Sequence, residues 1–430
     1  MDKNHLLKSV FTIFATESEV FTVNKTSCIM EYSDIQPLLN AYHRKLVATD
    51  LRFKRYLYDK INWDMRLIGI KGARGVGKTT MLMQHIKETF SNVDDAFYVS
   101  LDNLWFNSHN LEDLVEFLYS RGVCNIYFDE VHRFKGWTMV LKNFYDNYPD
   151  LNIVYTGSAM LAIDNSVADL SRRQSLHTLN GLSFREYLEY EGIRVVPPIE
   201  LEELLANHTG YAMEITSKTK ILKHFNEYLR HGFYPYYKEA GEDYLIRIGE
   251  VARLVIESDI PSAEDITYAT TQKIKKLLMV IAENVPFEPN INKLASQLES
   301  TRDQTLKMLY LLDRAALLQL LTEKIKDYKH LTGPKKIYLD NVNLMYALSG
   351  KVSEGTARET FFANQVGAAA SLTLPKQGDF LVDGKYTFEV GGSSKNFSQI
   401  AGLPDSYLAV DDIEVGSRNR IPLWMFGMLY

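Results

Sequence analysis

Residues 66–90 read RLIGIKGARGVGKTTMLMQHIKETF, and this stretch decides the fold. It begins with a short apolar run, passes through a glycine-rich turn and continues into a pattern typical of an amphipathic helix. The turn, GARGVGKT at 72–79, fits the pattern G-x-x-x-x-G-K-[ST] at every fixed position. A strand before such a turn and a helix after it form the context in which the pattern binds phosphate. The stretch therefore predicts a phosphate-binding loop within an α/β sheet.

Each part of this loop has a chemical task. Backbone N–H groups wrap the phosphates, which requires glycine where φ is positive, and the next helix directs its positive end at the anion. Lys78 is expected to reach the β- and γ-phosphates of ATP, and Thr79 to offer its hydroxyl to Mg²⁺. The predicted nucleotide-binding residues are Gly72, Ala73, Arg74, Gly75, Val76, Gly77, Lys78, Thr79 and Thr80. The alternative is a chance glycine turn ahead of a helix.

Short apolar runs alternate with amphipathic stretches after residue 66. Buried strands that alternate with helices indicate βαβ crossovers and a parallel sheet covered on both faces. The predicted strands are RLIGI (66–70), AFYVSL (96–101), CNIYF (124–128), NIVYT (152–156) and a fifth near Leu176–Leu182, with helices at 80–90, 110–122 and 137–148.

Two of these strands end in polar side chains. Asp129 and Glu130 follow one strand, and an acid at the carboxyl end of a parallel strand faces the ligand crevice. Asp129 is expected to hold Mg²⁺ and Glu130 to polarise the attacking water. Thr156 and Ser158 follow the next strand and are candidates to orient that water or to sense the γ-phosphate. Helix capping for the acids and turn chemistry for the hydroxyls are the alternatives.

The order of these motifs resembles the prokaryotic AAA-like P-loop ATPases of the additional-strand, catalytic-glutamate class. The motifs that carry the resemblance are the loop at 72–79, Asp129–Glu130, Thr156–Ser158, LSRR (170–173), LSFREY (182–187), GFYPYY (232–237) and ESDI (257–260). The resemblance implies the sheet order 5-1-4-3-2. It also makes Arg172 or Arg173 the candidate arginine finger, in cis or across a subunit contact, with a solvated arginine pair as the alternative.

The chain is expected to form a multidomain α/β protein with five parts. These are a helical lead-in (1–60), the AAA-like P-loop ATPase core (61–198), a helical domain (199–263), a winged-helix-like domain (264–347) and a restriction-endonuclease-like domain (348–430). The last assignment rests on the resemblance, because that family's ATPase is commonly joined to such a domain.

The segment 264–347 resembles a winged helix with residues 299–315 as its recognition helix. Basic side chains on or near the expected wing would neutralise DNA phosphates. They are Lys324, Lys326, Lys329, His330, Lys335 and Lys336. Several apolar positions place much of the helix in a core, so contact with a protein partner is the alternative.

Acidic side chains in the tail resemble a restriction-endonuclease-like metal site. Asp379 and Glu389 each lie on a strand-like segment and are candidates to hold a second Mg²⁺. Gly391 stands where that pattern has a lysine. Lys395 could still reach the site, but it follows a glycine–serine loop expected to be too flexible to position an amine without outside packing. We therefore expect no nuclease activity and a docking module held to the chain by a final apolar strand, Pro422–Tyr430.

The charge balance and the cysteine content of the chain exclude some classes of protein. The chain has 48 basic and 54 acidic residues, a net charge of −6, which excludes a basic nucleic-acid coat protein. Cys28 and Cys124 lie far apart without metal-ligand spacing, as expected in a reducing compartment. No signal peptide or long apolar run is visible, so we expect a cytoplasmic protein without membrane contact.

The expected activity is Mg²⁺-dependent ATP hydrolysis that drives a conformational switch. The alternatives are an ATP-gated effector that binds or cleaves DNA, and an ATP-binding scaffold with little turnover. The partners in these interpretations are ATP, DNA, another protein or a second copy of the chain.

Overall fold

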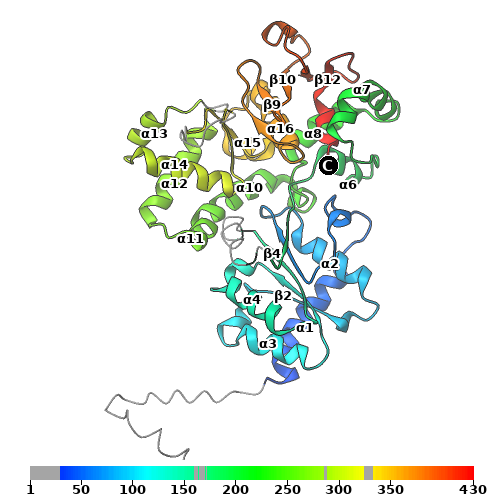
Figure 1. Cartoon of the computed structure of the whole chain (residues 1–430), viewed down its shortest axis with the longest axis vertical. Helices are drawn as coiled ribbons and strands as arrows, with labels where there is room; N and C mark the ends of the chain where they lie inside the picture. The colour runs from blue at the N-terminus through cyan, green and yellow to red at the C-terminus, as the bar shows by residue number, and fades with distance from the viewer. Residues whose placement is uncertain (1–29, 159–162, 164–169, 171, 285–287, 324–332) are drawn as a thin grey trace, which may run out of the picture.

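The computed structural model describes residues 30–158, 163, 170, 172–284, 288–323 and 333–430. Its lower half in Figure 1 contains a five-stranded parallel sheet of order β2-β3-β4-β1-β5. The strands are β1 (Leu67–Lys71), β2 (Ala96–Ser100), β3 (Asn125–Asp129), β4 (Asn152–Gly157) and β5 (Ser175–Thr178). This order, read from the other edge, confirms the predicted 5-1-4-3-2.

The strands form because their apolar runs are buried on both faces of the sheet. Successive residues of a strand face opposite sides of the sheet. Tyr127 accordingly packs in the core that includes α2, whereas Ile126 and Phe128 pack in the core on the other side. The covering helices are α2 (Lys78–Thr89) on the first face, with α3 (Leu111–Tyr119) and α4 (Trp137–Asn147) on the second. The predicted helices are confirmed.

The amino-terminal part is only partly helical. Helix α1 (Tyr32–Ala48) buries Ile35 and Tyr42 and packs beside β2, but residues 49–57 are not helical and η1 (Tyr58–Lys60) is a short 3-10 turn. The expected helical lead-in over 1–60 is therefore wrong for residues 49–57, and its first 29 residues lie outside the described residues. Tertiary contacts override the local pattern here, because the extended chain carries Arg55 beneath the phosphate-binding loop.

The region after the sheet is helical, as predicted. It contains α6 (Phe184–Tyr190), α7 (Leu201–Thr216), α8 (Ile221–His231), α9 (Tyr237–Ala240), η5 (Gly241–Asp243), α10 (Tyr244–Leu254) and α11 (Ile260–Ala263). A π-helical turn, η6 (Val255–Asp259), connects α10 with α11.

Three helices and an antiparallel pair of strands follow. They are α12 (Tyr268–Ala282), α13 (Ile291–Gln297), α14 (Arg302–Arg314), β6 (Leu318–Leu321) and β7 (Lys336–Leu339), before α15 (Val342–Leu348). The expected recognition helix, α14, buries Met308, Leu309 and Leu312 in the core. Lys324, Lys326, Lys329 and His330 lie outside the described residues.

The tail is a second α/β unit. Helix α16 (Glu354–Gly367) packs on a mixed sheet of order β12-β11-β10-β9-β8. The strands are β8 (Leu372–Thr373), β9 (Phe380–Val382), β10 (Tyr386–Gly391), β11 (Ser406–Val410) and β12 (Arg420–Pro422). The strand-like segments DFLV (379–382), KYTFEV (385–390) and YLAV (407–410) correspond to β9, β10 and β11.

The predicted final strand at 422–430 is wrong. β12 ends at Pro422, and Leu423–Met428 form the 3-10 helix η8. Every side chain of η8 is buried, a pattern that lacks the alternation of a strand facing solvent on one side. η8 packs against α16 and α6, and Figure 1 shows the chain end beside α6. The backbone oxygen of Tyr430 accepts hydrogen bonds from Ser183 Oγ at 2.6 Å and from Arg185 Nε at 2.8 Å.

Among the residues that the structure describes, we find no helix that combines the length and the apolar character required to span a bilayer.

Candidate active site

The glycine-rich loop connects β1 to α2. Gly75 and Gly77 have φ of +81° and +98°, a conformation that side-chain-bearing residues rarely adopt. A Cβ on Gly72 would lie 2.3 Å from the Leu179 oxygen, so the loop also needs glycine for space. Lys78 Nζ donates to the backbone oxygens of Gly72 and Ala73 at 2.7 and 3.0 Å. The loop thus closes around the lysine ammonium group.

Lys78 is a desolvated cation. Burial lowers the pKa of the Lys78 ammonium, while the carboxylates of Glu130 and Asp129 act in the opposite direction. A buried cation beside backbone N–H groups at a helix amino terminus is a strong attractor for phosphate. This arrangement has the geometry expected of an anion site, and its binding of phosphate remains a prediction.

Asp129 lies at the end of β3 among hydroxyl groups. Thr79 Oγ1 donates to Asp129 Oδ2 at 2.6 Å, and the Tyr98 hydroxyl donates to the same oxygen at 2.7 Å. Thr156 Oγ1 donates to the other carboxylate oxygen. The Thr79 hydroxyl and the Asp129 carboxylate are hard oxygen ligands, and this donor set fits Mg²⁺. Tyr98 escapes prediction, because a tyrosine within a strand carries no motif.

Glu130 has an unusual backbone. Its φ of 54° and ψ of 43° are left-handed, a conformation that costs a side-chain-bearing residue roughly 1–3 kcal/mol and that clusters at functional sites. Ser158 Oγ donates to Glu130 Oε2 at 2.8 Å, and His132 Nδ1 lies 3.3 Å from the same oxygen. Thr156 and Ser158 thus contact the two acids, and their roles toward water or phosphate remain predictions.

A hollow of about 300 Å³ opens beside these groups. Thr79, Asp129 and Glu130 line one part of it, and Lys45 and Tyr98 line another. Lys45 Nζ donates to the Tyr98 hydroxyl at 3.0 Å, which connects α1 to the site.

Arg55 contacts the phosphate loop through the backbone of Val76, and no sequence motif marks it. Its guanidinium is buried, donates to the Val76 oxygen, and pairs with Glu186 through Nε–Oε1 and Nη2–Oε2 contacts of 3.0 and 2.9 Å. Glu186 belongs to LSFREY and forms a capping box with Ser183. Arg55 lies in no motif, so only its spatial neighbours reveal it.

Two later motifs reach the loop from the helical region. A Cβ on Gly75 would lie 2.4 Å from Tyr236 Cε1, so the GFYPYY turn packs directly on the loop. Arg74 Nε and Nη2 each donate to the Asp259 carboxylate at 2.8 Å. Burial would raise the pKa of Asp259, but the neighbouring His132 and Arg74 hold it at about 2.

The predicted arginine finger lies elsewhere. Arg173 pairs with Asp146 at 2.8 Å, where α4 leads into β4, at the amino edge of the sheet and away from the loop. Arg172 is exposed. The fold therefore does not support a finger role in cis for Arg173, because its guanidinium is engaged at the opposite edge. A role across a subunit contact remains a prediction.

The tail carboxylates are paired with lysines. Lys336 Nζ lies 2.7 Å from Glu359 Oε2 and 3.7 Å from Asp379 Oδ1, and Lys395 Nζ pairs with Glu389. Burial raises the pKa of Asp379 to about 6, and the nearby Glu359 adds to the shift. Within the described ranges, no three His, Cys, Asp or Glu side chains are grouped to hold a metal ion. The predicted second Mg²⁺ site has its carboxylates already balanced by ammonium groups.

Two expectations about these lysines are wrong. The side chain of Lys336 is 15% exposed and engaged with Glu359, so Lys336 does not present its charge on a wing. Lys395 is not loosely held, because its backbone N–H donates to the Gly392 oxygen at 2.9 Å and its Nζ donates to Gln399 at 3.0 Å. A turn positions the amine that the glycine–serine composition suggested would be mobile.

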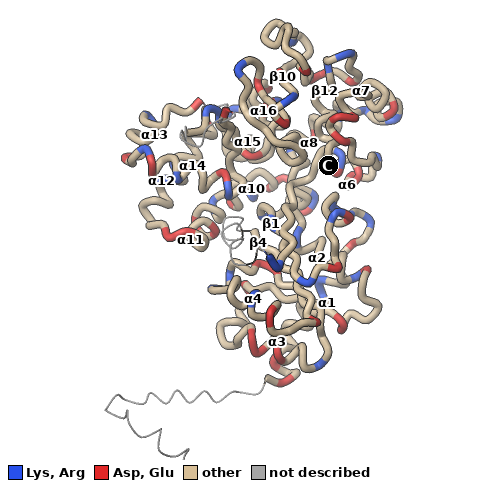
Figure 2. Tube along the Cα trace, in the orientation of Figure 1, with Lys and Arg blue, Asp and Glu red and all other residues tan. Residues whose placement is uncertain are grey.

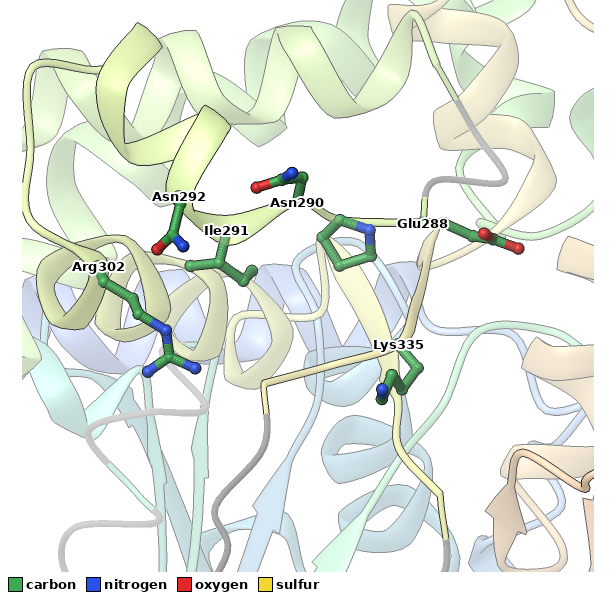
Figure 3. A pocket seen from close by; sticks show the side chains of 7 residues that line it. Glu288, Asn290, Ile291, Asn292, Arg302 and Lys335 are labelled. Carbon is green, nitrogen blue, oxygen red and sulfur yellow. The ribbon is translucent and has the colours of Figure 1, made fainter.

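Another hollow, of about 490 Å³, lies on the segment 264–347. Figure 3 shows Arg302, at the start of α14, and Lys335, just before β7, on either side of it, with Asn290 and Asn292 above. Figure 2 shows charges of both signs along α12 to α14. The basic character is therefore local to Arg302 and Lys335.

The sheet order, the loop and the paired acids define the class of fold: this part of the chain has the AAA-like P-loop fold. Residues 64–188 match the family described as an AAA domain. An uncharacterised protein of Methanocaldococcus jannaschii is 27% identical over 296 residues, which span 65% of this chain and 62% of that protein. The alignment thus covers less than two thirds of the relative's own length.

Solved structures resemble the chain weakly. A Walker-type ATPase of Pyrococcus abyssi aligns over 71% of this chain and 99% of its own, with 12% identity and a TM-score of 0.40. AMPPCP-bound DnaA of Aquifex aeolicus aligns over 66% of this chain and 89% of its own, with 13% identity and a TM-score of 0.24. Likenesses this distant carry no information about function.

Proposed function

We propose that the chain binds Mg·ATP in the loop at 72–79 and hydrolyses it to ADP and phosphate. One observation carries the proposal: the Thr79 hydroxyl, which follows the loop lysine, donates to Asp129 at 2.6 Å, with Glu130 as the next residue. Phosphate-binding, metal-binding and water-activating groups therefore meet at one edge of the sheet. Thr79 and Asp129 would hold the Mg²⁺, which neutralises charge on the phosphate oxygens when it is bound.

Each protein group has a separate task in this proposal. Lys78 and the loop N–H groups bind and orient the β- and γ-phosphates. Glu130 polarises the water whose oxygen attacks the γ-phosphorus as the bond to the bridging oxygen breaks and ADP leaves. Thr156 and Ser158 hold the two acids, since each donates a hydrogen bond to one of them.

Phosphate release from ATP by the full chain tests the proposal. We expect Mg²⁺-dependent turnover that chelation of the metal abolishes and that added Mg²⁺ restores. Tight Mg·ATP binding without phosphate release would instead favour the ATP-binding scaffold. Absence of both would remove the proposal.

We further propose that turnover drives a conformational switch in the helical region. Tyr236 packs on Gly75, and Asp259 pairs with Arg74, so two parts of that region contact the phosphate loop. A rearrangement of the loop around phosphate would change both contacts. Hydrogen exchange of residues 232–260 with and without a non-hydrolysable ATP analogue tests this, and unchanged protection would contradict it.

DNA contact is a second proposal, and Arg302 and Lys335 favour it. Both cations line the hollow of Figure 3, together with Glu288, and cations at such a surface can neutralise backbone phosphates. Arg302→Glu and Lys335→Glu should each weaken duplex binding and lower its salt slope by about one. No binding by the wild-type chain at low salt would assign the hollow to a protein partner.

For the tail we propose a docking module without nuclease activity. Lys336 lies between Glu359 and Asp379, no three His, Cys, Asp or Glu side chains of the described ranges are grouped to hold a metal ion, and η8 ties the tail to α6. Incubation with DNA and Mg²⁺ or Mn²⁺, with and without ATP, should give no cleavage. Cleavage that Asp379→Ala and Lys395→Ala both abolish would promote the DNA-cleaving effector to first place.

A further inference from the structure

A row of charged side chains runs from the phosphate loop to Glu130 through the helical region. Arg74 donates two hydrogen bonds of 2.8 Å to Asp259, and His132 Nε2 lies 3.8 Å from Asp259 Oδ1. The other ring nitrogen of His132 lies 3.3 Å from Glu130 Oε2. Two segments separated by more than a hundred residues thus meet at one imidazole ring.

Asp259 occupies an unusual position. It is 2% exposed and ends the π-helical turn η6, a rare conformation that is frequently found at functional sites. Arg133 anchors the same turn, through Nη1 to Ser258 Oγ at 2.7 Å and Nη2 to Asp259 Oδ1 at 3.3 Å. A buried carboxylate is costly unless it is paired, and here Arg74 and Arg133 of the ATPase domain provide the pairing.

His132 has no other visible task. Its ring is buried, and neither nitrogen makes a hydrogen bond of good geometry within the described residues. The distances to Glu130 and Asp259 are those of ionic contacts. The ring lies between the two carboxylates and so steadies Glu130 Oε2, which Ser158 Oγ also contacts.

We propose that Asp259 is a positioning residue for Glu130. The Asp259 carboxylate keeps the His132 ring beside the Glu130 carboxylate. Because Arg74 of the phosphate loop donates to the same Asp259 carboxylate, the position of Asp259 depends on the conformation of that loop. This inference rests on the proposed function, because it concerns the orientation of the group that polarises water. Asp259 contacts the loop arginine and the histidine, and acts on the reaction only through them.

Asp259→Asn tests the inference because it keeps the shape of the side chain and removes its charge. The kcat of ATP hydrolysis should fall about 10- to 100-fold, the usual effect of losing an outer support. The KM and the Mg·ATP Kd should stay within about twofold of wild type. His132→Gln should likewise lower kcat and leave the KM and the Mg·ATP Kd nearly unchanged. The double variant should be no slower than the slower single variant, because residues acting in series are not additive.

Asp411→Asn is a matched control. It breaks a carboxylate–arginine pair in the tail, in which Arg358 Nε donates to Asp411 Oδ2 at 2.8 Å. Its turnover should equal that of the wild type.

Three outcomes decide the matter. Wild-type kcat in folded Asp259→Asn and His132→Gln overturns the inference, as does a raised KM at unchanged kcat. If Asp259→Asn does not fold, His132→Gln decides alone. If only the inference fails, the wild-type chain still hydrolyses ATP and Glu130→Gln still loses that activity. A wild-type chain without turnover removes the proposed function and the inference together.

Discussion

Two groups of carboxylates in this molecule are balanced in opposite ways: one lies at the carboxyl end of β3, and the other lies in the tail on α16 and β10. At the phosphate loop, Asp129 accepts hydrogen bonds from the hydroxyls of Thr79, Tyr98 and Thr156, which carry no charge. In the tail, Glu359 and Glu389 receive the ammonium groups of Lys336 and Lys395.

The two groups of carboxylates differ in their capacity to bind a cation. Hydroxyl donors orient a carboxylate but leave its negative charge to attract a cation, whereas a lysine neutralises it. We therefore expect a metal at the first group of acids and a structural ion cluster at the second. Local sequence shows the acids, but it does not show which cations reach them.

The largest expected effect is on chemistry at Glu130. Glu130→Gln keeps the shape and hydrogen bonding of the side chain but loses the charge that polarises water. Turnover should fall by a factor on the order of 10² to 10⁴, with Mg·ATP affinity nearly unchanged. Single-turnover phosphate release and calorimetric titration measure the two quantities.

The tail provides the control for this comparison. Asp379→Asn alters a carboxylate of the lysine-balanced cluster and should leave turnover at the wild-type level. Full activity in Glu130→Gln would reassign Glu130 to a purely structural role at its turn.

Loss of the loop lysine should affect binding. Lys78→Ala removes a buried cation, and hydrogen bonds to charged groups contribute about 1.5–3 kcal/mol, so Mg·ATP affinity should drop roughly 10- to 100-fold. Lys87→Ala, on the exposed side of the same helix, is the control and should bind normally. Unchanged affinity in folded Lys78→Ala protein would remove the central claim.

Lys336→Met should affect stability but not turnover. It leaves Glu359 and Asp379 close together without their shared cation, which should cost about 1–3 kcal/mol of unfolding free energy at pH 8. The loss should shrink at pH 5, because Asp379, with its pKa raised to about 6, then carries a proton. Thermal unfolding at both pH values measures this, with the exposed Lys335→Met as the control. An equal loss at pH 5 and pH 8 would show that packing, not charge, is responsible.

A third acidic side chain, Asp340, is neutralised by protonation and not by a neighbouring cation. Burial raises the pKa of Asp340 to about 7, above the unfolded value of 3.8. The native state therefore holds a proton that the unfolded state releases, so stability is lost as the pH rises from about 4 to about 7. Asp340→Asn should raise the melting temperature at pH 8, with a gain of about 1–2 kcal/mol, and leave it unchanged near pH 4. An equal shift at both pH values would contradict this account.

The loop, the strands around it and the paired acids were all predictable from short patterns. Each is local: the G-x-x-x-x-G-K-[ST] spacing reflects backbone conformation, and the apolar runs reflect burial on both faces of a parallel sheet. Once the strands are parallel, their carboxyl ends lie at one edge, so Lys78 and Asp129 must be neighbours. The sheet order followed from the family resemblance.

Tertiary structure alone decided the remaining features. Arg55, Tyr98 and Asp259 reach the site across long sequence separations, and no spacing rule connects them to the loop. Arg173 lies at the opposite edge because the chain enters β5 there, although its motif suggested a finger. Lys336 turns inward and the last residues form a 3-10 helix, because available partners, not local propensity, determine where a charge or an apolar segment is buried.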